Sequence, residues 1–275
     1  MTDEFSTPPE GREPPAGVDD GVPQSARIWN YWLGGKDNYP IDRQVADQFS
    51  EIYPPIIDIA RAQRYFLARA VRYLAGEAGV RQFLDIGTGL PTVDNTHEIA
   101  QRVAPSARIV YVDNDPLVLM HARALLTSHP DGITDYVNAD LRDTAAVVRG
   151  AAKTLDFTRP IAITMMGILG HIARYDDAKA VVRLLLNAVS SGSYLVVADG
   201  TNLFGGKVYD EAMRIWNAAA EPRYLLRTPD EIAGFFDGLE LVEPGVVSVP
   251  LWRPDPSPFE SDGTVDNFGG VGRKP

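Results

Sequence analysis

The chain has 275 residues, of which 45% are hydrophobic and 23% are charged, a composition typical of a globular protein. It contains no cysteine, which excludes disulfides, zinc–thiolate sites, iron–sulfur clusters and cysteine nucleophiles. The formal net charge of −11 favours a small neutral or cationic ligand over nucleic acid, because nucleic-acid-binding domains normally carry a basic surface. We expect a cytoplasmic protein without a secretory signal or a membrane span, since no apolar run reaches the required length.

The part of the chain before residue 80 is predicted to lie outside the core domain. Residues 1–21 are rich in proline and acidic residues, so we expect a disordered tail. Residues 22–79 are expected to form an N-terminal helical extension that acts as a cap or lid. Its predicted helices cover residues 23–33, a segment capped by Asp42 that ends before Pro54, and residues 56–74.

From residue 80 to residue 275, short apolar runs alternate with amphipathic segments, which predicts one α/β domain. Such an alternation is typical of a mostly parallel sheet with helices on both faces. The predicted strands cover residues 83–86, 108–113, 133–138, 161–166, 193–198, 240–250 and 268–272. The predicted helices cover residues 94–103, 116–128, 144–152, 176–190, 207–220 and 228–236. In the helix over 176–190, we expect Leu184 to be buried with Val181 and Leu185.

The first two predicted strands end in residues that are typical of a nucleoside pocket. The first contains Asp85 and is followed by Gly87 and Gly89, and the second ends at Asp113. In open α/β sheets such a pocket lies at the carboxyl ends of the strands. Glycine lets the backbone turn sharply and lets a ligand approach it. An acid at the end of the second strand can accept hydrogen bonds from both ribose hydroxyls.

The glycine motif departs from the dinucleotide fingerprint, because Thr92 stands where a third glycine is expected. Asp85 would also repel a ligand phosphate, whereas it would attract a cationic or zwitterionic ligand. S-adenosylmethionine carries an ammonium and a sulfonium and no phosphate, so the residues favour it over NAD. Asp140, after the third strand, can accept from an adenine amino group. For each of these acids, a helix-capping role is the alternative.

At this point the chain resembles a known family. The series Asp85–Gly89, Val112–Asp113 and Asn138–Asp140 resembles the core of class I S-adenosylmethionine-dependent methyltransferases. The upstream segment Ser25–Asn38 resembles the methyltransferase family that carries a GGKDN segment ahead of this core. The resemblance implies a seven-stranded, mostly parallel Rossmann-like sheet with helices on both faces and an antiparallel last strand. It also implies S-adenosylmethionine as the cofactor and an unidentified small molecule as the methyl acceptor.

The resemblance also implies a cofactor site. Asp113 would bind the ribose, Asp140 the adenine amino group, and the backbone of Gly87–Gly89 the amino-acid end. The implied cofactor-binding residues are Asp85, Gly87, Thr88, Gly89, Asp113, Asn114, Asp140, Leu141, Met165, Asp37 and Asn38. The channel of the methyl donor should be lined by Met165, Met166, Gly167 and Ile168, and both methionines can equally be core residues. The loop that contains Asp37 and Asn38 is a candidate lid, with a simple turn between helices as the alternative.

Methyl transfer mainly requires that the acceptor be held in line with the methyl group. A general base is needed only when the acceptor must lose a proton. His171, which follows the fourth strand, is the candidate base, and a solvent-facing loop histidine is the alternative. We expect no metal site.

Three other functions are weighed against methyl transfer. One is an S-adenosylmethionine-binding module without catalysis. Another is an NAD(P)-dependent short-chain dehydrogenase, because Tyr175 and Lys179 have the Tyr-x-x-x-Lys spacing of that class. A nucleic-acid methyltransferase is disfavoured by the acidic composition. We therefore expect no nucleic-acid or membrane partner, and the sequence does not predict the oligomeric state.

Overall fold

A computed structural model of the protein describes residues 18–92, 94–125, 127–220, 222–255 and 263–275. Residues 1–17 of the predicted tail lie outside these ranges. Within them, no helix is both long and apolar enough to cross a membrane.

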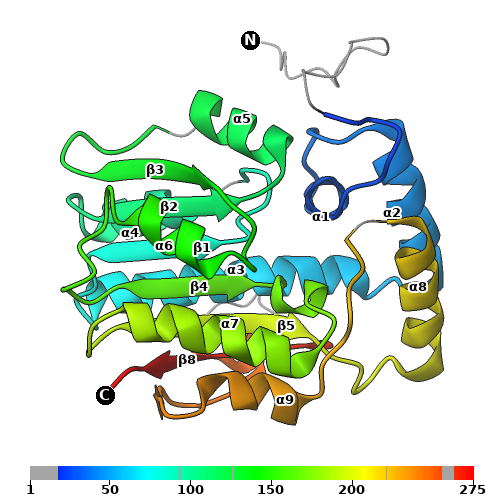
Figure 1. The fold of residues 1–275 in the computed structure, drawn as a ribbon. Helices are drawn as coiled ribbons and strands as arrows, with labels where there is room; N and C mark the ends of the chain where they lie inside the picture. The colour runs from blue at the N-terminus through cyan, green and yellow to red at the C-terminus, as the bar shows by residue number, and fades with distance from the viewer. Residues whose placement is uncertain (1–17, 93, 126, 221, 256–262) are drawn as a thin grey trace.

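The strands form one mixed sheet in the order β3-β2-β1-β4-β5-β8-β6, with β7 also paired to β8. The parallel strands are β1 (Gln82–Ile86), β2 (Arg108–Asp113), β3 (Ile133–Asn138), β4 (Ala162–Met166) and β5 (Tyr194–Gly200). The antiparallel strands are β6 (Glu240–Leu241), β7 (Val247–Ser248) and β8 (Asn267–Arg273). The predicted α/β fold, with its antiparallel last strand, is confirmed (Figure 1).

The helices alternate with the strands after β1, as predicted. The α-helices are α1 (Ser25–Trp32), α2 (Pro40–Ile52), α3 (Ile56–Gly76), α4 (Thr96–Val103), α5 (Pro116–Leu125), α6 (Thr144–Ala151), α7 (Tyr175–Ala188), α8 (Gly206–Ala219) and α9 (Pro229–Ala233). The short 3-10 helices are η1 (Leu169–His171), η2 (Gly234–Phe236) and η3 (Val249–Leu251).

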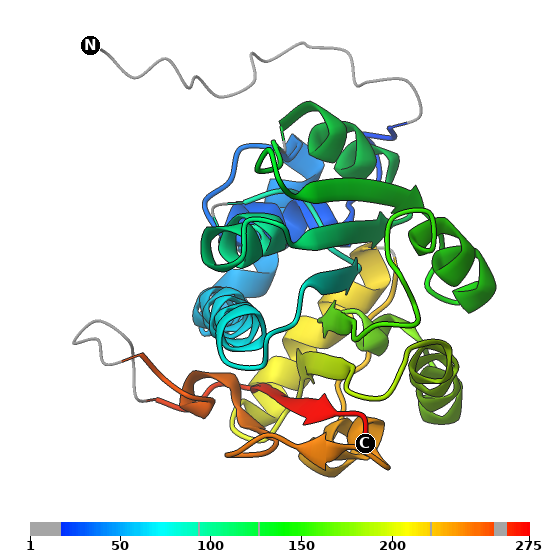
Figure 2. The ribbon, with the colours of Figure 1, turned by 90° about the vertical axis from the view of Figure 1, so that its left-hand side faces the viewer.

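Two apolar layers cover the two faces of the sheet. Successive side chains of a strand point to opposite faces, so Phe83 packs with α3 and α4 while its neighbour Leu84 packs with α6 and α7. Figure 2 shows α3 and α4 in cyan on one side of the sheet and α6 and α7 in green on the other. Helix α3, the last helix of the predicted N-terminal extension, thus packs on one face of the sheet.

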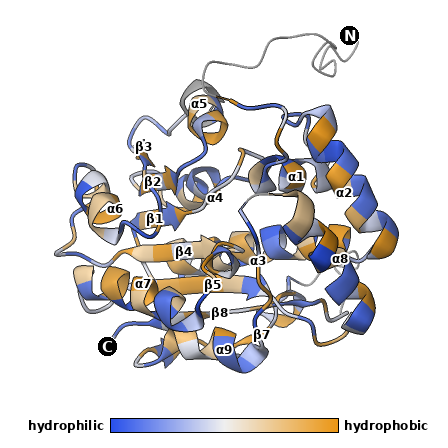
Figure 3. Ribbon diagram, turned by 45° about the vertical axis from the view of Figure 1, so that its right-hand side comes forward, coloured by the Kyte–Doolittle hydropathy of each residue, from blue (hydrophilic) through white to orange (hydrophobic). Residues whose placement is uncertain are grey.

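Helices α1, α2 and α8 lie together at the carboxyl ends of the parallel strands (Figure 1). The ring centroid of Trp32 on α1 is 5.3 Å from that of Phe49 on α2 and 5.7 Å from that of Trp216 on α8. Figure 3 shows that α2 and α8 carry both hydrophobic and hydrophilic residues, as expected of helices with one buried side. This helical layer faces the edge of the sheet at which the sequence predicts a ligand site.

Three local predictions are wrong. The predicted strand over 240–250 is split into β6 and β7, because Pro244 has no N–H and Gly245 takes a φ of 89°. Leu184 is 53% exposed, because the residues that recur on the buried side of α7 leave it on the opposite side. Asp42 is not the N-cap of α2; the helix begins two residues earlier, and Asp42 accepts the N–H of Tyr39 at 2.8 Å.

Arg69 of α3 holds the segment before β8 in place. Its buried guanidinium donates to the carbonyl oxygens of Trp252 at 2.9 Å and Val249 at 2.7 Å. Because Arg69→Met removes this donor from two carbonyls, we expect the free energy of unfolding to fall by about 2–4 kcal/mol in denaturant titrations. Arg72→Met is the control, since this exposed arginine pairs only at the surface and should cost less than about 1 kcal/mol. Equal losses in the two variants would contradict the role of Arg69.

Candidate functional site

Two neighbouring cavities lie at the carboxyl ends of the parallel strands. The inner cavity, of about 150 Å³, lies between α1, α3, the loop after β1 and the ends of β2 and β4. The outer cavity, of about 410 Å³, lies between the residues just before α1 and the loops after β2 and β3. Gly87, Asp113 and Ile168 line both cavities, so the two form one continuous site. Its size is in the range of small-molecule sites.

The loop after β1 owes its shape to two glycines. Gly87 has a φ of 70° and donates its N–H to the carbonyl of Val112 at 2.8 Å. Gly89 has a φ of 65° and donates its N–H to Oδ2 of Asp113 at 3.0 Å. A Cβ on Gly87 would lie 2.6 Å from Cγ1 of Ile168. Glycine is therefore required at position 87 by both conformation and space.

Asp113 lines both cavities and joins the loop after β1 to the loop after β2. Its Oδ2 accepts from Gly89, and its Oδ1 accepts the N–H of Asp115 at 3.0 Å. Burial raises the pKa of this carboxyl group to about 6, although the two N–H donors act in the opposite direction. Each oxygen of a carboxylate can accept a further hydrogen bond. Asp113 therefore lies where a ligand hydroxyl can reach it.

Asp85 lies at the bottom of the inner cavity. Its side chain is buried and accepts hydrogen bonds from the hydroxyls of Thr96 at 2.6 Å and Thr164 at 2.7 Å. Burial raises the pKa of Asp85, while the two threonines and the charge of Arg64 act to lower it. The threonine bonds join β1 to β4 and to the start of α4. Asp85 thus shapes the cavity floor and supplies a negative charge beside the positive charge of Arg64.

Two polar residues of α3, Gln63 and Arg64, line the inner cavity and were missed in the sequence. Gln63 is 6% exposed, and its Nε2 has no hydrogen-bond partner among the described residues. Burial lowers the pKa of Arg64, and Asp85 raises it. A signal was present, because Gln63 occupies the same helical stripe as Ile59, Phe66 and Ala70. A polar residue on an apolar stripe indicates a polar neighbour or a ligand.

The outer cavity contains Asp140 and Leu141 beyond the end of β3. Leu141 is buried and forms an apolar wall. Asp140 accepts from Nε of Arg142 at 2.9 Å, and this arginine lowers the pKa of Asp140. A ligand amino group would therefore share this carboxylate with Arg142. The inner cavity also contains Thr88 and Asn114, as implied by the resemblance.

Methionine 166, rather than Met165, faces the site. Met165 is fully buried in the core layer of α6 and α7, whereas Met166 lines the inner cavity. The reason is the alternation of side chains along β4, because neighbouring residues point to opposite sides. The prediction that Met165 lines the cavity is corrected to Met166.

Asp37 and Asn38 contact the site only indirectly. Asn30 of α1 lines the inner cavity, and its Oδ1 accepts from the N–H of Asp37 at 3.0 Å and from Nδ2 of Asn38 at 2.9 Å. Arg43 donates to the carbonyl of Asn38 at 3.0 Å. The loop therefore positions Asn30, and a direct contact of Asp37 or Asn38 with a ligand is not part of this geometry.

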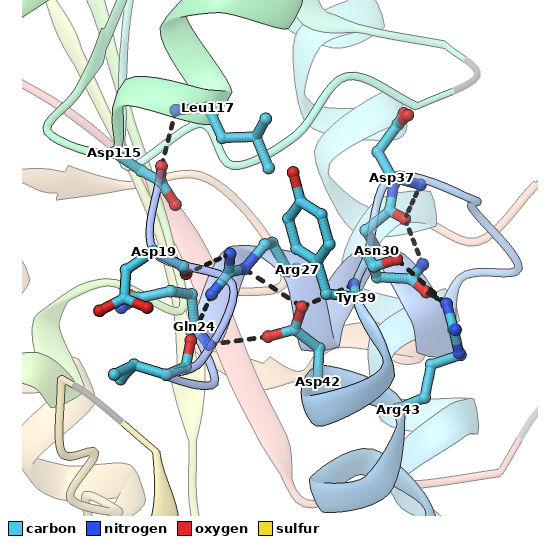
Figure 4. A network of polar contacts seen from close by, with 12 residues as sticks. Asp19, Gln24, Arg27, Asn30, Asp37, Tyr39, Asp42, Arg43, Asp115 and Leu117 are labelled. Carbon is cyan, nitrogen blue, oxygen red and sulfur yellow. Dashed lines mark hydrogen bonds and ion pairs between the residues drawn. The ribbon is translucent and has the colours of Figure 1, made fainter. Parts of the chain in front are cut away.

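A strap, defined as residues 18–24, forms one wall of the outer cavity. Arg27 of α1 binds the strap, because its guanidinium donates to the carbonyl of Asp19 at 2.9 Å and to the carbonyl of Val22. Nε of Arg27 lies 3.2 Å from Oδ2 of Asp42, and both side chains are buried. Figure 4 shows these groups between the strap and α2, with the ring of Tyr39 beside Arg27.

His171 lies at the end of η1 and lines both cavities. Its Nδ1 is 2.8 Å from the carbonyl of Arg223, so Nδ1 carries a proton. Burial lowers the pKa of His171, and the carbonyls of Arg223 and Pro222 act in the opposite direction. A neutral imidazole of this tautomer has its lone pair on Nε2 and can accept a proton there.

Comparison with known proteins identifies relatives of the whole chain. A family model described as S-adenosyl methyltransferase matches residues 11–275. A DUF574 family protein from Streptomyces avermitilis, known from a crystal structure, is 46% identical in sequence to this chain. The match covers 94% of this chain and 99% of that chain, with a TM-score of 0.89. A putative methyltransferase from Thermobifida fusca is 42% identical, covers 95% of this chain and 98% of that chain, and has a TM-score of 0.86. No protein with a curated function matches the chain.

The two glycines of the loop allow a matched test. We expect Gly87→Ala to lower the free energy of unfolding by more than Gly89→Ala, because a Cβ at 87 meets Ile168 while a Cβ at 89 meets nothing within 4 Å. Both variants bear the strain of a left-handed residue, about 1 kcal/mol. Adding Ile168→Ala to Gly87→Ala should recover part of the extra loss in denaturant titrations. An equal loss of stability in the two single variants would show that the close approach of Gly87 to Ile168 does not contribute to stability.

Proposed function

Because the chain belongs to the S-adenosyl methyltransferase family, we propose that it transfers a methyl group from S-adenosylmethionine to a small-molecule acceptor. The pairing of charges in the inner cavity is the observation that best supports this function. Asp85 is positioned for an ammonium group, while Arg64 and the unpartnered amide of Gln63 are positioned for a carboxylate. An amino-acid zwitterion needs a negative group beside its ammonium and a positive group beside its carboxylate. The methionine part of S-adenosylmethionine is such a zwitterion.

The remaining residues fit the nucleoside part of the same molecule. Asp113 has oxygens available for ribose hydroxyls, and the outer cavity offers Asp140 and the apolar wall of Leu141 for adenine. The same acids argue against a phosphate-bearing cofactor, since a phosphate beside Asp85 or Asp113 would be repelled. Bound at this site, S-adenosylmethionine supplies an electrophilic methyl group and its own leaving group.

The chain itself then has to position the acceptor, exclude water and remove a proton when the acceptor requires it. Trp29 and Leu33 of α1 cover the inner cavity and limit the access of water. Nε2 of His171 is the group that would take a proton from an acceptor hydroxyl or ammonium. We propose that the loop of Asp37 and Asn38 contributes as part of a lid, through its hydrogen bonds to Asn30.

The dehydrogenase alternative finds no support at the site. The hydroxyl of Tyr175 donates to the carbonyl of Glu231 at 2.8 Å, and Lys179 pairs with Asp237 at 2.6 Å. Glu231 belongs to α9 and Asp237 follows η2, and none of these four residues is among those that line the two cavities within the described part of the chain. A module that binds the cofactor without catalysis stays the second candidate, because methyl transfer requires no fixed catalytic side chain.

Calorimetric titration of the full chain tests the proposed function. We expect S-adenosylmethionine and S-adenosylhomocysteine to bind and NADH not to bind. Arg64→Met should weaken S-adenosylhomocysteine about tenfold or more, because a charged hydrogen bond is worth about 1.5–3 kcal/mol. Arg61→Met serves as the control, since Arg61 lies on the exposed side of the same helix. Binding of NADH in place of S-adenosylmethionine would overturn the proposal.

The pKa of Asp113 predicts how cofactor binding depends on pH. Ribose hydroxyls donate to the ionised carboxylate, and burial raises its pKa to about 6. We therefore expect the affinity for S-adenosylhomocysteine to be constant above this pH and to fall as the pH decreases through about 6, when the carboxylate takes up a proton. In Asp113→Asn the affinity should be lower and should lose this dependence. Titrations at a series of pH values check the prediction, which an unaltered pH profile in the variant would contradict.

A further inference from the structure

A short segment after α8 is bound both to η1 and to the end of β5. We call this segment, residues 222–227, the clasp. Leu225 donates its N–H to the carbonyl of Gly170 in η1 at 2.9 Å. Arg227 donates its N–H to the carbonyl of Gly200 at the end of β5, also at 2.9 Å. The clasp therefore joins the sheet to the 3-10 helix that carries the candidate base.

The ring of Tyr224 packs against both of these elements. A Cβ placed on Gly170 would lie 2.5 Å from Cε2 of Tyr224, and a Cβ on Gly200 would lie 3.2 Å from its Cε1. The centroid of the ring is 5.0 Å from that of His171, with the two planes at 81°. This edge-to-face arrangement is favourable for aromatic pairs. Tyr224 is therefore the residue of the clasp that contacts the ring of the candidate base.

Asp199 anchors the hydroxyl group of Tyr224. The hydroxyl donates to Oδ1 of Asp199 and accepts the N–H of Gly200 at 2.9 Å. Asp199 is completely buried, and burial raises its pKa to about 7, whereas the hydroxyl of Tyr224 and the charge of Arg227 act to lower it. A hydrogen bond to a charged acceptor is stronger than one between neutral groups. The bond from Tyr224 thus attaches the clasp firmly to β5.

The same segment determines the tautomer of His171. Nδ1 of His171 lies 2.8 Å from the carbonyl oxygen of Arg223, the residue that precedes Tyr224. The hydrogen bond made by one ring nitrogen decides which nitrogen carries the proton. Asn217 of α8 holds the backbone of Tyr224, since its Oδ1 accepts the N–H of Tyr224 at 2.7 Å and its Nδ2 donates to the carbonyl of Tyr224 at 2.8 Å. The clasp therefore has two anchors, one on α8 and one on β5.

We propose that Tyr224, anchored on Asp199, is a positioning residue that keeps the proton of His171 on Nδ1. With the proton on Nδ1, the lone pair of Nε2 is available to take a proton from a methyl acceptor. Within the described part of the chain, Tyr224 is not among the residues that line the inner or the outer cavity, so it acts through His171. This inference rests on the proposed function, in which His171 is the base.

Nitrogen-15 NMR of the histidine side chains in the full chain tests this role, because the shifts of the two ring nitrogens show which one carries the proton. The chain has four histidines, so the spectrum of His171→Gln assigns the signals of His171. At about pH 8, where the imidazole is neutral, we expect the Nδ1–H tautomer of His171 to predominate by about tenfold or more in the unsubstituted protein. In Tyr224→Phe, which loses the hydroxyl and keeps the ring, this ratio should fall about threefold or more. In Tyr224→Leu, which also loses the ring, it should fall further.

Tyr53→Phe is the matched control. The hydroxyl of Tyr53 donates to the buried carboxylate of Asp266 at 2.9 Å, so this variant removes a bond of the same kind away from the clasp. It should leave the tautomer of His171 unchanged, although denaturant titrations should show a loss of stability similar to that of Tyr224→Phe. His97 is the internal control in each spectrum, because its Nδ1 is 2.9 Å from the hydroxyl of Tyr111, which no variant alters.

Titration with S-adenosylhomocysteine separates this inference from the proposed function. The affinity should be the same in the unsubstituted protein, Tyr224→Phe and Tyr53→Phe, because neither tyrosine is among the residues that line the two cavities in the described ranges. The NMR measurement needs no ligand. A protein that does not bind S-adenosylhomocysteine would therefore contradict the proposed function, while the tautomer of His171 would still report on Tyr224.

Three results would overturn the inference. The first is an unsubstituted protein in which the proton of His171 is mainly on Nε2. The second is an unaltered ratio of tautomers in the Tyr224 variants, because Asn217 alone would then hold the clasp; if Tyr224→Leu does not fold, the ratio in Tyr224→Phe decides. The third is an equal change in Tyr53→Phe, which would assign the effect to a general loss of stability. A change confined to the Tyr224 variants would confirm the inference.

Discussion

The buried ion pair of Arg27 and Asp42 is the interaction on which the ligand site depends most. Both side chains are almost completely buried, and desolvation makes such a pair costly unless every remaining donor is bound. Arg27 directs its other donors to the carbonyls of the strap, and Asp42 accepts N–H groups from Gln24 and Tyr39. One pair of charges thus connects the strap, α1, the loop before α2 and α2 itself. These contacts join the four segments at one wall of the outer cavity.

Much of the site follows from a rule that can be applied to the sequence. Parallel strands end at one edge of a sheet, so the sequence predicts that Asp85, Gly87 and Asp113 meet there, and all three line the inner cavity. The sequence predicts that Met165 and Met166 both line the cavity, but Met165 belongs to the core, because the outcome depends on which face of β4 a residue occupies. Thr164 is the one polar residue of the short strand β4, so the strand offers little alternation from which that face could be determined.

Other parts of the site depend on contacts between distant segments. Asp37 and Asn38 are polar loop residues, and only the fold shows that they bind Asn30 instead of lining a cavity. The aromatic cluster of Trp32, Phe49 and Trp216 forms where α8 packs on α1 and α2, across a separation of more than 150 residues in the chain. Amphipathic patterns predict that such helices have a buried side, but they do not say which helices share it. The charged residues at the strand ends are therefore predictable from the sequence, whereas the helical layer above them required the structure.

The position of Trp29 between two cavities has a thermodynamic consequence. Trp29 of α1 lines both the inner cavity and a smaller cavity of about 30 Å³ beside α8, so a ligand that shifts this side chain in one space changes the lining of the other. Linkage makes such an effect reciprocal: whatever factor one ligand contributes to the affinity of a second, the second contributes to the affinity of the first.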